Sequence, residues 1–386
     1  MTNPPESESG RLPWVDLARG LAAFAVAAGH LRYLMFEGLE QDDRLFWRFF
    51  DLLTAQGHAA VIVFFVLSGF LVGGSVHNAI CQSHFSWPRY WIQRLTRLWL
   101  VLLPALALTA LLDALGRDVI GGSLYTGLLA SPSRGGSLPD GEAIGAIWSA
   151  STFLGNALFL QRIAVPTFGT NSPLWSLSYE FWYYAIFPLV MIAAHRQQTR
   201  TARMSSAILA SLICAVLPLK VVVYGVFWGL GYAAFLAGRM SHPVKWRQLR
   251  GAWLLPSLIF AAVLFWLPGA LRLTPAILDA ATAGSFALVL WALSARRMNS
   301  IPAALSRRMA DFSYTLYLTH FPFLALVMTA FNDAELYVAS SKFLLIYCFI
   351  LTCALAYAWC AWWLFERHTR SVQRLLNRSL SKHRTA

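Results

Sequence analysis

The chain has 386 residues, of which 58% are hydrophobic and only 13% are charged. Soluble proteins carry about 25% charged residues, so the composition excludes an ordinary soluble domain. The formal net charge is +13; we attribute it first to the Lys and Arg that collect in cytoplasmic loops of membrane proteins, and not to nucleic-acid binding.

Apolar segments close to 20 residues long recur along the chain, and this is the length that a helix needs to cross a bilayer. We therefore predict an all-α, polytopic membrane helical bundle of about ten transmembrane helices. A cytoplasmic segment (1–13) precedes the membrane domain (14–366), and a basic cytoplasmic tail (367–386) follows it. The predicted spans are residues 14–35, 57–76, 97–115, 174–194, 204–219, 221–238, 252–271, 275–294, 311–331 and 341–365.

The first predicted span, WVDLARGLAAFAVAAGHLRYLMF (14–36), carries the ionisable residues Asp16, Arg19 and His30. Each costs roughly 2.5 kcal/mol or more at the membrane centre, so this helix should face a polar interior. Arg19 and His30 lie about three turns apart, on one face, with roughly 16 Å between them. Asp16 shares that face. The stripe indicates chemistry inside the bundle; the alternative is that charges near the helix end extend to water.

Basic residues sort into alternate loops. If the N-terminus is cytoplasmic, most Lys and Arg fall on the inner side, and the acidic residues gather in the outer loops. This distribution follows the positive-inside rule and places both termini in the cytoplasm. The five cysteines lack a metal-binding spacing, so we expect no metal site.

One long outer connection, residues 116–173, contains an apolar run from Ile144 to Leu160. If this run crossed the membrane, every later basic loop would lie outside. We therefore expect an amphipathic or re-entrant helix on the outer face.

The second span contains FFVLSGFLVGG (64–74), in which Ser68, Gly69, Gly73 and Gly74 are small. Such residues let helices, or a ligand, approach closely. We favour close helix packing at this motif.

Arg94 and Arg97 lie three positions apart at the predicted inner end of the third span. A pair of guanidinium groups on one helix face suits a phosphate. The alternative is ordinary anchoring at the membrane surface.

Glu180 lies in a strongly apolar, aromatic span, about six residues or 9 Å from its outer end. His30 lies at a similar depth, so the two side chains could meet. A carboxylate beside an imidazole fixes its tautomer, as in hydrolytic triads. The alternative is a lone Glu that is bonded to a neighbouring Ser or Tyr.

Tyr314, Tyr317 and His320 are spaced by three residues in the ninth span and form a polar stripe. Packing and function are equally good interpretations of this stripe.

These motifs, taken together and in order, resemble the acyltransferase 3 family of integral-membrane O-acyltransferases. The matching pieces are Arg19 and His30 with ten residues between them, FFVLSGFL, RLTR (94–97), WSLSYEFWYYAIFPL (175–189) and SYTLYLTHFP (313–322). Family members commonly show WSLSVEEQFY, so Glu180 is kept while Phe181 replaces the second acid. Some relatives carry an extra hydrolase-like domain, which we do not expect in this chain.

The resemblance implies transfer of an acyl group, expected to be acetyl, from a cytosolic acyl-coenzyme A such as acetyl-CoA to a hydroxyl of a cell-surface or periplasmic glycan or glycolipid. It also implies a multi-pass protein of the bacterial inner membrane. No nucleic acid is expected as a partner, and homo-oligomer formation stays open.

The predicted layout places the coenzyme A phosphates at Arg94 and Arg97 and the pantetheine arm past Arg19. His30 is the general base, oriented by Glu180 or Asp16. Direct transfer and an acylated His30 both remain open. The proposed oxyanion donors are Arg19, Ser178 or Tyr184, and the substrate-contacting residues are Trp175, Ser178, Tyr184, Tyr317 and His320. The alternative function is a transporter or flippase that uses these intramembrane charges for substrate or proton passage.

Overall fold

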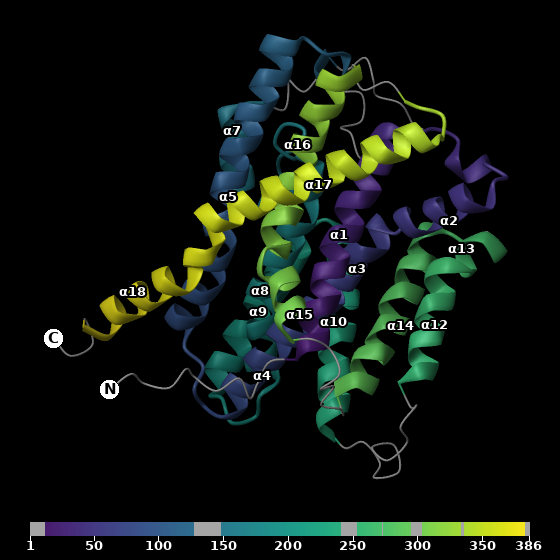
Figure 1. The fold of residues 1–386 in the computed structure, drawn as a ribbon. Coiled ribbons are helices and arrows are strands. Elements are labelled where there is room, and N and C mark those ends of the chain that lie inside the picture. The colour runs from purple at the N-terminus through teal and green to yellow at the C-terminus, as the bar shows by residue number, and fades with distance from the viewer. Residues whose placement is uncertain are drawn as a thin grey trace, which may run out of the picture.

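The computed structural model describes residues 12–126, 148–240, 253–271, 273–294, 303–332 and 336–382. In these ranges the chain is helical, and the only β-type pairings are two isolated bridges. The helices pack into a bundle, which α17 (Ser341–Leu364) crosses obliquely (Figure 1). The predicted all-α class is confirmed for this part of the chain.

α1 (Pro13–Met35) starts and stops as its sequence predicts. Pro13 occupies the first turn, where its fixed φ and missing N–H are tolerated. Asp16 also lies in the first turn, where a negative charge interacts favourably with the positive end of the helix dipole. Phe36 then leaves the helix in an extended conformation, and its N–H still donates to the Arg32 carbonyl.

α1 lies among other helices rather than at the edge of the bundle. It packs closely against α3 (Gly57–Ser68), α15 (Ala303–Asp311) and α16 (Ser313–Asn332). The apolar Leu21 and Phe24 remain exposed on its other side. The polar stripe of α1 therefore faces protein.

The remaining helices differ widely in length. The longer ones are α5 (Trp87–Ala114), α8 (Trp175–Ala194), α9 (Arg200–Val216), α10 (Leu219–Met240), α12 (Leu254–Phe265), α14 (Pro275–Ser294) and α18 (Thr369–Lys382). The shorter ones are α2 (Leu45–Thr54), α4 (Gly74–Cys81), α7 (Ala150–Ala157) and α13 (Leu267–Ala270). Single 3₁₀ turns cover Leu39–Gln41, Ser123–Thr126, Ser172–Leu174 and Glu366–His368, and π-helical segments cover Gly69–Gly73 and Leu115–Ile120.

Each of the ten predicted spans coincides with a helix, but not every helix is a clear membrane span. Within the described residues, seven helical segments are long and apolar enough to cross a membrane. α1, α9 and α12 are not among them: α9 has 17 residues and α12 has 12. A multi-pass helical protein is supported, whereas the count of about ten is not confirmed.

In the long connection before α8, residues 116–126 and those from 148 onward are described, so Ile144 and the first part of the predicted apolar run lie outside the described residues. The remainder contains α7, whose eight residues extend about 12 Å. This length is too short to cross a membrane. α7 packs against α5 instead.

Glycines permit the closest helix approach in the bundle. A β-carbon on Gly69 would lie 1.8 Å from the carbonyl oxygen of Trp228, and one on Gly231 would lie 1.9 Å from that of Val66. No side chain fits in either space, so the π-helical segment and α10 can meet only through glycine. The favoured interpretation of the FFVLSGFLVGG motif, close packing, is confirmed.

We predict that Gly231→Ala destabilises the protein, because the new methyl group must displace backbone of α3. Overpacking of this kind costs about 1–3 kcal/mol, which thermal unfolding of the detergent-solubilised protein would detect. Gly229→Ala, two residues earlier on α10, is the matched control, because a β-carbon added at Gly229 would have no neighbouring atom within 4 Å. Equal unfolding temperatures for the two variants would contradict this account of the packing.

Candidate active site

Three cavities follow α1 from its first turn to its last. The basic cavity, with a volume of about 490 Å³, lies at Asp16 and Arg19. The central cavity, of about 130 Å³, is lined by Arg19 and Glu180. The histidine cavity, of about 760 Å³, contains His30. The two larger spaces thus lie toward opposite ends of the helix.

The basic cavity is rich in guanidinium groups. Its charged lining residues are Arg19, Arg97, Arg307, Arg367 and Arg370 on one hand and Asp16, Asp311 and Glu366 on the other. Glu366 is already engaged, because its Oε2 accepts hydrogen bonds from the Thr315 hydroxyl (2.5 Å) and amide (3.2 Å). The excess of guanidinium groups, which bind phosphate oxygens well, makes this cavity suitable for a phosphorylated ligand.

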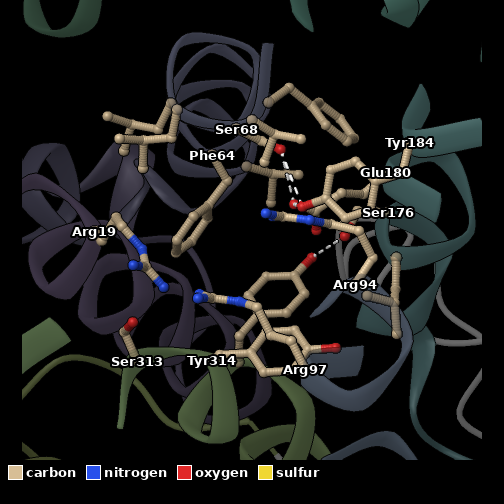
Figure 2. A pocket seen from close by; sticks show the side chains of 17 residues that line it. Arg19, Phe64, Ser68, Arg94, Arg97, Ser176, Glu180, Tyr184, Ser313 and Tyr314 are labelled. Carbon is tan, nitrogen blue, oxygen red and sulfur yellow. Dashed lines mark hydrogen bonds between the residues drawn. The ribbon is translucent and has the colours of Figure 1, made fainter. Parts of the chain in front are cut away.

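The central cavity is small and charged. Figure 2 shows Arg19 reaching into it from one side and Arg94 and Arg97 from the other. Glu180 faces the same space, and its Oε1 accepts hydrogen bonds from Ser68 (2.9 Å) and from the Tyr184 hydroxyl. Hydroxyl groups therefore hold the carboxylate in a cavity that three arginines line.

Shared walls place the three cavities in series. Arg19 and Arg97 line both the basic and the central cavity, and Val61 and Tyr317 line both the central and the histidine cavity. Tyr317 is fixed at the second junction, where its hydroxyl donates to the Pro173 carbonyl (3.1 Å). The three spaces thus adjoin along α1.

His30 forms a hydrogen-bonded pair with His320 of α16. Its Nδ1 lies 2.8 Å from His320 Nε2, and the two rings are stacked with centroids 5.1 Å apart. His320 Nδ1 lies 2.9 Å from the Leu316 carbonyl oxygen. A carbonyl only accepts, so His320 Nδ1 is the donor, and in the neutral pair His320 Nε2 accepts from His30 Nδ1. His30 Nε2 is then left with a lone pair, as a general base requires.

The histidine cavity holds a second paired imidazole, which was not predicted from the sequence. His58 Nε2 donates to Asp279 Oδ1 over 2.9 Å, and the Tyr224 hydroxyl donates to Oδ2 over 2.8 Å. His58 and Tyr224 line the cavity, whereas Asp279 is buried behind them. Asp279 could have been found from sequence, because it is an acid within a predicted span, like Glu180.

The structure corrects the predicted partner of His30. Glu180 lines the central cavity and bonds to Ser68 and Tyr184, as in the alternative of a carboxylate bonded to neighbouring hydroxyls. Asp16 lies at the opposite end of α1, in the basic cavity. Neither orients His30; the buried His320 does so, and it does not line the cavity as a substrate contact.

Of the other predicted site residues, some line the cavities and one is buried in a hydrogen bond to the backbone. Trp175 and Tyr317 line the histidine cavity, and Tyr184 lines the central one. Ser178 is fully buried, and its hydroxyl donates to the Gln161 carbonyl (2.8 Å), so the substrate and oxyanion roles predicted for it are not supported.

The two predicted phosphate-binding arginines occupy different places. Arg97 reaches the basic cavity, but Arg94 lines only the central one. Arg94 lies between the rings of Tyr90 and Tyr184, with centroids 5.8 and 5.7 Å away. Of the predicted pair, therefore, only Arg97 lines the basic cavity.

We predict that Val61→Cys, made in a background with the native cysteines replaced by serine, reacts with a small water-soluble thiol reagent. Val61 lines the junction of the central and histidine cavities, where water should reach it. Ile62→Cys is the matched control, because Ile62 is fully buried and lines none of the three cavities. Equal labelling rates would contradict an aqueous junction.

Comparison with known proteins identifies the family of the chain. The family model described as an acyltransferase domain matches residues 12–363. The acyltransferase MdmB of Streptomyces mycarofaciens is 30% identical over 182 residues, which cover 46% of this chain and 39% of that protein, so the match spans well under half of the relative. No solved structure matches the chain. The family match covers most of the chain, which therefore belongs to the acyltransferase 3 family.

Proposed function

We propose that this protein is a membrane O-acyltransferase that moves an acyl group, expected to be acetyl, from cytosolic acyl-coenzyme A to a hydroxyl of a cell-surface or periplasmic glycan or glycolipid. The observation that carries the proposal is His30: its Nε2 is left with a lone pair by the His320 and Leu316 hydrogen bonds, in a cavity large enough for a sugar. Family membership supports the reaction class.

The acyl donor enters at the basic cavity, on the cytoplasmic side. Arg97, Arg367 and Arg370 line it, and their guanidinium groups are suited to the phosphates of coenzyme A. This assignment replaces the predicted Arg94 and Arg97 pair. The pantetheine arm then extends through the central cavity along α1, where Arg19 and His30 are about 16 Å apart, a span of the order of an extended pantetheine arm.

The reaction takes place where the central and histidine cavities meet. His30 Nε2 removes the proton of the acceptor hydroxyl as its oxygen attacks the thioester carbonyl carbon. The tetrahedral intermediate then collapses, the carbon–sulfur bond breaks, and the imidazolium returns the proton to the coenzyme A thiolate. In the alternative route, His30 Nε2 attacks the thioester carbonyl carbon first, and the carbon–sulfur bond breaks to release coenzyme A thiolate. The acceptor hydroxyl then attacks the acyl-imidazole, the bond to Nε2 breaks, and the hydroxyl proton passes through the freed imidazole to the thiolate.

We predict that His30→Ala lowers acyl transfer by about 10²–10⁴-fold, the usual contribution of a general base, while acyl-coenzyme A still binds. The test compares acylation of surface glycans by mass spectrometry in cells that produce the wild type or the variant. His84→Ala is the control, because His84 is exposed and lies outside the three cavities. Undiminished acylation by His30→Ala would refute the assignment, and substrate movement without acylation by the wild type would favour the transporter.

His320 positions His30, so its replacement should affect turnover more than binding. We predict that His320→Ala lowers kcat by about 10²-fold, the scale of a small misplacement of a catalytic group, with KM for acyl-coenzyme A unchanged. His320→Gln should recover part of the loss, because its amide oxygen can accept from His30 Nδ1 and restore the tautomer. Equal kcat values for the Ala and Gln variants would argue that His320 only fills space.

A further inference from the structure

The histidine cavity carries fixed positive charge. Its lining residues include Arg162 and Lys220, together with the imidazoles of His30 and His58, and no Asp or Glu among the described residues lines it. The nearby carboxylate of Asp279 is buried and already receives hydrogen bonds from His58 and Tyr224. No ion pair joins Arg162 or Lys220 to a carboxylate within the described ranges.

An aromatic wall separates these two cations. Trp175 meets Tyr179 and Tyr224 edge-on, with ring centroids 5.2 and 5.9 Å apart, and the two tyrosine rings are 6.0 Å from each other. Lys220 Nζ lies 5.8 Å from the Tyr224 ring, and Arg162 lies close enough to Tyr179 to act on it electrostatically. The cations therefore flank the wall. Aromatic faces suit the apolar faces of a sugar ring, and the flanking cations suit an acidic substituent on it.

The backbone that presents Arg162 is fixed on both sides. Gln161 is fully buried; its side chain donates to the Leu174 carbonyl (2.9 Å), and its carbonyl accepts from Ser178 (2.8 Å). Arg162 donates its N–H to the Val165 carbonyl (2.7 Å) and has a φ of 61°.

This left-handed conformation is rare for a residue with a β-carbon, and such strain gathers at functional positions. The loop thus holds an exposed guanidinium at the cavity wall on a strained backbone position, which glycine would suit better. An arginine at this left-handed position is explained if its guanidinium is needed for binding in the cavity.

We propose that the histidine cavity is an anionic-sugar site: the acceptor carries a carboxylate or phosphate that Arg162 and Lys220 bind, while its ring lies on the Trp175 wall. The inference rests on the proposed function only in that it identifies the bound sugar as the acceptor of the acyl group. The binding itself needs no acyl donor, so it can be tested even if acyl transfer fails.

The test is equilibrium binding of three fluorescent oligosaccharides to the purified full-length protein in nanodiscs of zwitterionic lipid, without acyl-coenzyme A. They differ only in the terminal sugar, which is glucose, glucuronic acid or glucose 6-phosphate. We expect an acidic form to bind about five- to ten-fold more tightly than the neutral one, as one or two partly exposed ion pairs allow. The comparison of the two acids identifies carboxylate or phosphate, and the preference should shrink as ionic strength rises.

Variants assign the preference to the two cations. Arg162→Gln and Lys220→Gln should each bring the ratio of acidic to neutral affinity closer to one, without weakening binding of the neutral oligosaccharide. Arg162→Gly should do the same, and because glycine suits the left-handed backbone, misfolding cannot explain its effect. Arg48→Gln is the matched control, because Arg48 is an exposed cation outside the cavity, and it should keep the preference.

Two results would overturn the proposal. One is equal affinity of the wild type for all three oligosaccharides. The other is a loss of preference in Arg48→Gln as large as that in Arg162→Gln, which would assign the effect to general surface charge. Retained preference in the His30→Ala variant, combined with absent acylation, would separate this binding site from the chemistry at His30.

Discussion

The requirement that charged and polar groups of α1 avoid lipid determines how the bundle is built. Arg19 and His30 are costly in hydrocarbon, so other helices pack along the face that carries them. Side chains do not fill all of the space around that face, and three adjoining cavities remain. A helix that carries ionisable residues thereby forms part of the wall of the candidate active site.

Periodicity and apolar length predict the helices well in this protein. The span predicted at 275–294 agrees with α14, and every other predicted span overlaps a helix. The helices that these signals miss are amphipathic or short, and they include α2, α15 and α18. Such helices lie outside long apolar runs, so a search for membrane spans passes over them.

Side-chain pairing was harder to predict than helix position. The sequence predicts that Glu180 and His30 lie at similar depths and could meet, but in the structure they line different cavities along α1. The rotation of α8 directs Glu180 toward Ser68, and α16 supplies His320 to His30 instead. Ser178 shows the same limit, because it belongs to the matching motif yet bonds to the Gln161 carbonyl. Pairs such as His58 and Asp279, 221 residues apart, depend on tertiary contacts that no local pattern records.

The difference in size between the cavities bears on how the membrane stays sealed. A wide aqueous path from one face to the other would let protons and metal cations leak down their gradients. In this bundle the smallest of the three spaces is also the one into which Arg19, Arg94 and Arg97 project. Fixed guanidinium charges in a constriction repel cations, as they do in water channels that exclude protons, while they attract a polyanion. Under the proposed function, the same arginines would attract the phosphates of coenzyme A while they repel cations.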